Sequence, residues 1–291
     1  MELPLVVGVD GSESSLQAVD WAVDEATRYG LPLRLVHGSL WGRYDGLALA
    51  GGVGGPPEQA MGEEIVHAAG ERARQRGPEV KITAMVLPEE AEDALLREAR
   101  NATAVVIGHR GRGAVAELLL GSVSLAMAAR AHCPVIVVRG GKESRDGTHR
   151  RIVLGVGDAT TGDAAVRFAF RAAEARQCAL EAVRAWRCPA HETADHPLLV
   201  GEPAHYHQRH ASELLDDALS AARREHPEIE VHRSVVEGAA RKVLLDRSAT
   251  ADLLVVGARR RHGHFGLQLG RVGHAVLHHA ECPVAVVPLR G

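Results

Sequence analysis

The sequence of 291 residues has few cysteines, no large excess of one charge and no long apolar run. Its four cysteines show no CxxC spacing, which argues against a disulfide scaffold and favours a reducing, cytoplasmic setting. A formal net charge of −3 leaves no basic footprint for nucleic acid. No apolar run approaches membrane-spanning length, and the N-terminal segment has no positive region with a cleavage site. We therefore expect neither a nucleic-acid nor a membrane partner.

Two common nucleotide-binding motifs are also missing. No Walker lysine motif is present. The segment Gly155-Val-Gly157 follows an expected strand but lacks the third glycine of a dinucleotide loop. Neither motif therefore explains how this chain would hold a nucleotide.

The most informative stretch is residues 105–138, VVIGHRGRGAVAELLLGSVSLAMAARAHCPVIVV. It predicts a strand ending at Gly108, a glycine-rich loop, a helix over residues 123–130 with Ser122 as its N-cap, and a strand over residues 135–138. Glycines let a backbone pass close to a ligand, and a helix N-terminus adds its dipole, so the pattern favours anion binding. The alternative is an ordinary strand-to-helix connection in which the glycines only serve the turns.

Strands and helices alternate through the first half of the chain. This alternation predicts a parallel sheet with helices on both faces. The expected strands cover residues 3–9, 33–37, 80–86, 105–107 and 135–138, and the expected helices cover residues 14–29, 58–76, 90–100 and 123–130.

The pattern then starts again, which indicates an internal duplication. Residues 255–287 align without gaps on residues 106–138, so that Gly257 matches Gly108 and Gly270 matches Gly121. The polar segment GGKESRDGTHR lies between the two halves. We therefore predict one domain over residues 1–140, a linker over residues 141–150 and a second domain over residues 151–291.

The first half resembles a universal stress protein domain. The nucleotide signature of that family is Gly, two residues, Gly, nine residues, Gly, then Ser or Thr, and Gly108, Gly111, Gly121 and Ser122 have this spacing. The VGVDGS opening, the CPVIVV ending and the tandem arrangement are similar to the family too. The resemblance implies two tandem Rossmann-like domains of the adenine nucleotide alpha hydrolase-like type. Each would have a five-stranded parallel sheet flanked by helices, with ATP at the carboxyl ends of the strands.

The resemblance also implies roles for individual residues. Val9 and Asp10 would lie by the adenine, and Gly38 would make a backbone contact to it. Asp10 can equally be a turn-forming residue before Gly11, and it could help to hold a metal such as Mg²⁺. Ile107 and Gly108 would border the base and ribose. Backbone N–H and hydroxyl groups would hold the phosphates, from Gly111, Gly121, Ser122, Val123 and Ser124.

The second half departs from the signature. Arg260 stands where the first half has Gly111, Arg271 where it has Ser122, and Gly157 where it has Asp10. An arginine can pair with phosphate, but a bulky side chain now occupies a position where the backbone should approach the ligand. We therefore predict a weakened or absent nucleotide site in the second domain and a mainly structural role for it.

Histidines and cysteines were weighed as further candidates. The second half contains the neighbouring histidines His205, His207 and His210, and the helix pair His274 and His278. No carboxylate or cysteine stands at ligand spacing to them, so solvent-facing or interface histidines are favoured over a metal site. Cys133 and Cys282 precede expected buried strands and are interpreted as core residues rather than nucleophiles. No metal ligand and no catalytic residue is predicted.

Three classes of function remain. The favoured one is an ATP-binding regulatory protein whose nucleotide changes its contacts with an unknown protein partner during stress. The second is a slow ATPase or an enzyme that phosphorylates itself at Ser122 or Ser124, although no general base is evident beside the phosphate loop. The third is a scaffold that binds no nucleotide. We also expect the two domains to pair within one chain through residues 135–138 and 284–287, and this pair is compatible with a further homodimer.

Overall fold

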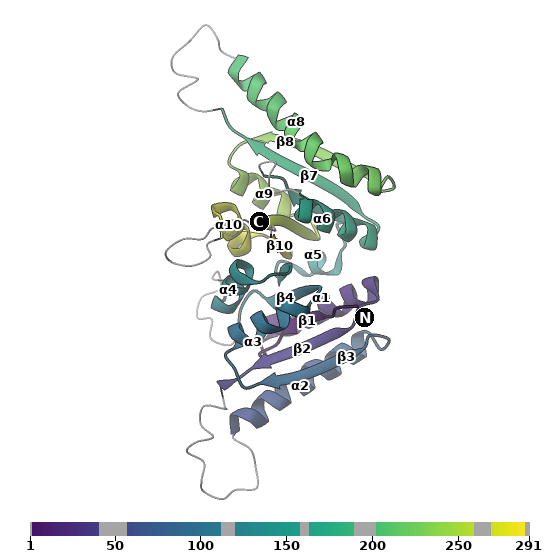
Figure 1. Cartoon of the computed structure of the whole chain (residues 1–291), viewed down its shortest axis with the longest axis vertical. Coiled ribbons are helices and arrows are strands. Elements are labelled where there is room, and N and C mark those ends of the chain that lie inside the picture. The colour runs from purple at the N-terminus through teal and green to yellow at the C-terminus, as the bar shows by residue number, and fades with distance from the viewer. Residues whose placement is uncertain are drawn as a thin grey trace, which may run out of the picture. The chain divides into compact units, whose positions relative to one another are not determined.

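The computed structural model describes residues 2–40, 57–111, 120–157, 163–188, 202–258 and 269–288. The chain divides into two compact units, Met1–Arg139 and Gly140–Gly291. Figure 1 shows the same alternation of strand and helix in both. Both units are α/β, as the sequence predicts.

The first unit is a five-stranded parallel sheet in the order β3-β2-β1-β4-β5. Helices α1 and α2 pack on one face, and α3 and α4 pack on the other. Its elements are β1 (Leu5–Gly8), α1 (Glu13–Tyr29), β2 (Leu33–Gly38), α2 (Pro57–Arg76), β3 (Ile82–Leu87), α3 (Ala91–Glu98), the 3₁₀ helix η2 (Ala99–Asn101), β4 (Ala104–Gly108), α4 (Ser122–Arg130) and β5 (Val135–Val138). Helices on both faces explain why β4 and β5 are buried along their whole length.

Local sequence signals set the ends of α1. Ser12 is the N-cap, and its hydroxyl accepts from the Ser15 amide at 3.2 Å. Gly30 ends the helix with φ of 65°, a conformation that favours glycine, and its N–H bonds to the last carbonyls. Between these ends α1 buries an apolar face that includes Ala18 and Ala22.

Two arginine–aspartate pairs join α1 to α2. Arg72 donates to both carboxylate oxygens of Asp20 at 2.8 and 2.6 Å, and Arg76 does the same with Asp24 at 2.6 and 2.8 Å. The hydrogen bond to Asp20 raises the pKa of Arg72 above its usual value. Two-point contacts of this kind fix the helices in orientation as well as in distance.

The second unit repeats this architecture in the order β8-β7-β6-β9-β10. Helices α6 and α8 cover one face of the sheet, and α9 and α10 cover the other. Its elements are α5 (Lys142–Asp146), β6 (Arg151–Gly155), α6 (Asp163–Arg176), β7 (Ala179–Trp186), α8 (Glu202–Glu225), β8 (Val231–Glu237), α9 (Ala240–Ser248), β9 (Leu253–Ala258), α10 (Arg271–His279) and β10 (Val284–Pro288).

The segment expected to be a linker contains the short helix α5. Gly147 ends this helix with φ of 77°, and the Thr148 amide donates to the Glu143 carbonyl at 3.1 Å. Within the second unit, Gly140 lies so close to Glu281 that an added Cβ would sit 2.0 Å from the Glu281 carbonyl oxygen. The segment is therefore packed structure, although its polar composition gave no hint of it.

The duplication extends to individual packing contacts. An added Cβ on Gly8 would lie 2.9 Å from a methyl group of Leu95, and one on Gly155 would lie 2.9 Å from a methyl group of Leu244. These are equivalent positions in the two halves, and each lets a helix pack closely over the first strand of its sheet. Within the described residues, no helix combines the length and apolar character needed to cross a membrane.

Candidate functional site

The loops that follow β1 and β4 begin on neighbouring strands. β1 lies between β2 and β4, and the chain leaves β1 toward β2 and later crosses to β4 on the other side. Loops at such a switch point diverge, and ligands of open α/β sheets bind there, at the carboxyl ends of the strands. Apart from Gly38, which ends β2, the residues predicted to bind ATP lie at these strand ends, in these loops or at the start of α4.

Val9 is held against β2 by hydrogen bonds of its backbone. It is buried, its amide donates to the Val36 carbonyl at 2.9 Å, and its own carbonyl accepts from His37 Nδ1 at 2.8 Å. The backbone amide and carbonyl of Val9 are both hydrogen-bonded to residues of β2. The chain turns away from the sheet at the next residue. This fixes the direction in which Asp10 leaves the strand.

Asp10 forms a local turn and faces the glycine loop. Its Oδ1 accepts from the Ser12 amide at 3.0 Å and from the Ser12 hydroxyl at 2.6 Å. A Cβ added to Gly111 would lie 2.6 Å from Asp10 Oδ2. The turn-forming interpretation of Asp10 is therefore correct, and the structure also places its carboxylate beside Gly111.

Two of the candidate glycines are needed for packing. A Cβ on Gly38 would lie 2.6 Å from the Cα of Ala91, at the start of α3. A Cβ on Gly108 would lie 2.5 and 2.6 Å from the hydroxyl and carbonyl oxygens of Ser14. Backbone atoms cannot move aside as a flexible side chain can, so these positions require glycine whether or not a ligand binds.

Gly121 has no such reason to be glycine. Its φ is −64°, which any residue adopts, and the nearest atom to an added Cβ, the His109 carbonyl oxygen, is 3.6 Å away. Gly121 is the N-cap of α4, and no side chain caps the helix. Among the described residues, the start of α4 is therefore sterically open at Gly121, and the cap residue brings no side-chain acceptor to its first N–H groups.

The prediction that Ser122 caps α4 is wrong. Ser122 is the first residue of the helix, and the extended residue before it, Gly121, takes the cap position. A capping hydroxyl must stand on the non-helical residue, so the Ser122 side chain is exposed instead of folded over the helix end.

Val123 and Ser124, the next two residues of α4, differ in their exposure to solvent. Val123 is half-buried. Ser124 is buried, and its hydroxyl donates to the Gly108 carbonyl at 2.8 Å. That bond ties α4 to the end of β4 and uses the one hydrogen of the Ser124 hydroxyl. Of the two hydroxyls predicted to contact phosphate, only that of Ser122 faces solvent.

Ser14, His109 and Arg110 complete the site and were missed as ligand-site residues. Ser14 Oγ accepts from the Arg110 amide at 3.3 Å and lies 3.0 Å from His109 Nδ1. His109 Nδ1 also lies 3.2 Å from the Val138 carbonyl oxygen. The His109 ring therefore links the end of β4 to the start of α1 and to the end of β5.

The Arg110 side chain has a buried donor whose acceptor is not found among the described residues. Its Nε is buried and makes no hydrogen bond within the part of the chain that the structure describes. Buried guanidinium groups normally have partners, so this nitrogen is suited to an anion. The only sequence signal was an arginine between two glycines of the loop.

The second unit repeats the strands and helices of the site but has different residues at the candidate ligand positions. Gly157 takes the place of Asp10, and its carbonyl accepts from Arg184, the counterpart of His37. Arg271 takes the place of Ser122 and is exposed, and Gly273 takes the place of Ser124, so the bond to the strand end is lost. Arg260, predicted to obstruct the loop, lies outside the described residues.

The cysteines predicted to be core residues are buried. Burial raises the pKa of the Cys133 thiol to about 11, which keeps it protonated at neutral pH. Cys282 is fully buried at the equivalent position. Both therefore pack in the core, as predicted.

The predicted histidine groups lie on two helices. His274 and His278 stack on α10 with ring centroids 4.3 Å apart. On α8, Tyr206 stacks on His210 at 6.2 Å and meets His207 edge-on at 5.5 Å. Ring contacts within each helix therefore hold these histidines together.

Comparison with known proteins identifies the family. The model of the universal stress protein family matches residues 3–139 and 148–288. The chain belongs to the universal stress protein family. Both halves match, so this member of the family contains two tandem domains.

Similar universal stress proteins cover nearly the whole chain. Universal stress protein Rv1996 of Mycobacterium tuberculosis is 32% identical over 98% of this chain and 94% of its own length. Universal stress protein Rv2005c of the same organism is 31% identical over 97% of this chain and 96% of its own length. A crystal structure of a universal stress protein from Archaeoglobus fulgidus superposes with a TM-score of 0.66 at 15% identity, covering 98% of both chains, and so shares the fold.

Proposed function

We propose that this universal stress protein binds ATP in its first domain, residues 1–140, and acts as a nucleotide-dependent regulator in the stress response. The observation that carries the proposal is the open start of α4 at Gly121. Glycine there is required neither by its φ nor by any atom of the residues that the structure describes, in contrast to Gly38 and Gly108. A phosphate approaching the uncapped N–H groups supplies the missing reason.

The proposed ligand lies across the switch point between β1 and β4. Val9 and Asp10 would contact the adenine with Gly38, and Ile107 and Gly108 would border the base and ribose. The phosphates would be held by Gly111, Gly121, Ser122, Val123 and Ser124. The buried Nε of Arg110 supports an anion beside this loop, because a phosphate oxygen would give it an acceptor.

The contacts of Ser124, Asp10 and Gly38 specify how each of these residues could take part in binding. Ser124 would act through its backbone, since its hydroxyl already donates to Gly108. Asp10 Oδ1 accepts two hydrogen bonds from Ser12, which fix the orientation of the carboxylate that would help to hold a Mg²⁺ ion accompanying ATP. Gly38 is explained by packing alone, so its contact with adenine rests on the family resemblance.

We propose that the second domain, residues 151–291, is mainly a structural partner of the first. Gly157, at the position equivalent to Asp10, has no carboxylate, and its carbonyl accepts a hydrogen bond from Arg184. Arg271 brings a cation to the start of α10, where the helix dipole favours an anion. The tandem arrangement supports pairing of the two domains within one chain, and we retain a homodimer, a regulatory protein partner and a cytoplasmic setting as parts of the proposal.

A slow ATPase or autophosphorylating enzyme is the second candidate. Ser122 is exposed at the start of α4 and is the better phosphate acceptor of the two serines, because Ser124 is buried and engaged. Incubation with γ-labelled ATP tests this role: label that is lost in Ser122→Ala supports it. Label that persists in Ser122→Ala rules Ser122 out.

Calorimetry with Mg²⁺-ATP tests the main proposal on the whole protein. We expect one site per chain, lost in Gly121→Arg and kept in the matched control Gly270→Arg. Gly270 is the equivalent N-cap of α10, with φ of −61° and no atom of the described residues within 4 Å of an added Cβ, so it is the matched position in the second unit. Circular dichroism confirms that both variants fold.

Each other result contradicts part of the proposal. Two sites per chain would show that Arg271 is tolerated and that our account of the second domain is wrong. Unchanged binding by Gly121→Arg would move the site elsewhere. No binding by the unaltered protein would favour a nucleotide-free scaffold.

A further inference from the structure

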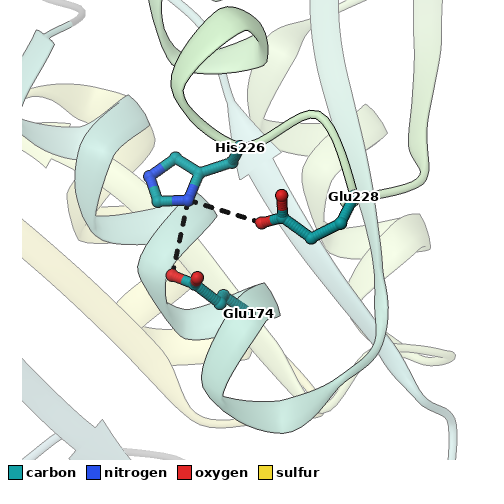
Figure 2. Close-up of side chains that lie close together, drawn as sticks. All are labelled: Glu174, His226 and Glu228. Carbon is teal, nitrogen blue, oxygen red and sulfur yellow. Dashed lines mark ion pairs between the residues drawn. The ribbon is translucent and has the colours of Figure 1, made fainter.

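Three metal-ligating side chains meet at one corner of the second unit. Glu174 lies in the last turn of α6, His226 follows the end of α8, and Glu228 lies in the turn before β8. We call these residues the His226 cluster. Figure 2 shows that both carboxylates approach the same ring nitrogen. The cluster lies at the amino end of β8, so the candidate nucleotide loops, at the carboxyl ends of strands, have no part in it.

The distances fit a common ligand. His226 Nδ1 lies 3.3 Å from Glu174 Oε2 and 3.7 Å from Glu228 Oε1, and the three ligand atoms are all within 4.8 Å of one another. Tetrahedral zinc has bonds of about 2.0–2.2 Å, which place neighbouring ligand atoms about 3.3–3.6 Å apart. Small rotations of the two exposed glutamates would bring all three atoms to that spacing.

The histidine is held in place by its surroundings. Its ring packs against Phe170 with centroids 5.8 Å apart, and its side chain is only 18% exposed. Its amide donates to the Ala222 carbonyl at 2.9 Å, and its carbonyl accepts from the Ile229 amide at 3.3 Å. The ring nitrogen is therefore positioned before any ligand arrives, while the glutamates, 53% and 55% exposed, can adjust.

The first unit shows that the fold does not require this cluster. Its equivalent residues are Thr27, Gly77 and Glu79, and the Thr27 hydroxyl donates to Glu79 at 2.8 Å. A Cβ on Gly77 would lie 2.5 Å from Val23 Cγ1, so no side chain fits there. The same corner is thus closed by one neutral donor in the first unit and carries three metal-ligand side chains in the second.

We propose that the His226 cluster binds a divalent transition-metal ion, with Zn²⁺ the ion that best fits one imidazole and two carboxylates. Ca²⁺ and Mg²⁺ prefer all-oxygen sites, which the imidazole argues against. Any proton on Nδ1 leaves to solvent when the lone pair coordinates the metal, and water completes the coordination. The ion would join the ends of α6 and α8 to the start of β8.

The competing explanation is a protonated histidine paired with two carboxylates. It predicts that substitution of the glutamates leaves the binding of Zn²⁺ unchanged. The chain also offers another place for the ion, the stacked rings of His274 and His278 on α10. Substitutions of the glutamates distinguish all three, because neither alternative gives Glu174 and Glu228 a role in metal affinity.

The test is a Zn²⁺ titration of the metal-free full chain by calorimetry at pH 7.5, with Glu174→Gln, Glu228→Gln and His226→Gln. Loss of a supporting residue outside the ligand set already costs about 10–100-fold in affinity, so each variant should bind at least about tenfold more weakly. The matched control is His232→Gln. His232 Nε2 lies 3.2 Å from the carboxylate of Glu230, and the described residues place no second carboxylate in an ion pair with it. It should leave the affinity unchanged.

Nuclear magnetic resonance adds a direct readout. Zn²⁺ should shift the His226 Nδ1 resonance in the unaltered protein and not in Glu174→Gln. Because the glutamates are exposed, their substitution keeps the fold and the result stays interpretable. The proposal is wrong if Zn²⁺ affinity and stoichiometry are the same in Glu174→Gln and Glu228→Gln as in the unaltered protein. The outcome is independent of ATP binding.

Discussion

Arg34 and Glu98 form an ion pair that the second unit contains with its charges exchanged. In the first unit Arg34 on β2 donates to Glu98 of α3 at 2.7 Å. At the equivalent positions, Glu181 on β7 pairs with Arg247 of α9 at 3.1 Å. The pair joins the second strand of each sheet to the helix over it. Because both arrangements fit the same frame, we infer that the fold needs opposite charges here but not a particular order.

Exchange of charge in the first unit tests this inference. Arg34→Glu alone places a second carboxylate beside Glu98, whose side chain is only 14% exposed, and should lower the free energy of unfolding by about 1–3 kcal/mol. Adding Glu98→Arg should restore most of the loss, because it reproduces the arrangement of the second unit. Urea unfolding followed by circular dichroism measures both effects.

The exposed pair of Glu71 and Arg74 on α2 is the control. Both side chains are about half exposed, so Arg74→Glu should cost no more than about 0.5 kcal/mol. An equal loss from Arg74→Glu and Arg34→Glu would contradict the special role of the Arg34 pair, as would a failure of the double exchange to recover stability.

Gly108→Ala should destabilise the first unit even without nucleotide. The new methyl group would lie 2.5–2.6 Å from two oxygens of Ser14, one of them backbone, so the strand end or α1 must shift. We expect a loss of about 1–3 kcal/mol in the free energy of unfolding, the usual cost of overpacking. Thermal or urea unfolding of the nucleotide-free protein measures it.

Gly70→Ala is the matched comparison. Gly70 lies within α2, and an added Cβ would contact only the flexible end of Arg74, at 3.5 Å. Alanine favours a helix interior by about 0.5–1 kcal/mol, so this variant should be more stable than the unaltered protein. Equal stability of the two variants would mean that Ser14 does not constrain Gly108.

The carboxylate of Glu79 should show a pH dependence that relies on Thr27. A backbone hydrogen bond and then the Thr27 hydroxyl lower the pKa of Glu79 below its usual value. A lowered pKa in the folded state means that these bonds stabilise the fold above the unfolded pKa, and that the contribution is lost as pH falls through the folded pKa. Thr27→Val should raise the pKa of Glu79 but leave it below the ordinary range, because the backbone bond remains.

Carbon-detected nuclear magnetic resonance of the glutamate carboxyl group measures this change. Thr148→Val is the control, since its hydroxyl donates to the backbone of Glu143 and not to a carboxylate. An unchanged Glu79 titration in Thr27→Val would show that the backbone bond alone lowers the pKa.

Sequence reasoning predicted the elements well and their ends less well. The strand expected over residues 3–9 is confirmed but shorter, Leu5–Gly8, and the helix expected over residues 90–100 ends at Glu98 and continues as a 3₁₀ turn. Apolar periodicity marks the middle of an element, whereas its ends depend on caps and neighbours. The misplaced cap at Ser122 has the same cause.

The candidate site illustrates what a motif leaves undecided. Spacing places Gly108, Gly111 and Gly121 in one signature and gives them one explanation. In the folded chain Gly108 serves packing against Ser14, Gly111 makes room for the Asp10 carboxylate, and Gly121 meets no steric constraint from the described residues. Residues far apart in the sequence create these differences, so spacing alone cannot separate the glycine that a ligand explains from the one that packing explains.

The sequence by itself determined the alternation of strand and helix, the duplication and the family, because each is recorded in the order of residues along the chain. Only the tertiary structure decided which side chains meet. It joined Ser124 to Gly108, Ser14 to His109 and Glu174 to His226, across separations that no local pattern spans. Hydrogen bonds and metal geometry act over a few ångströms in space, and folding alone brings such distant residues to that distance.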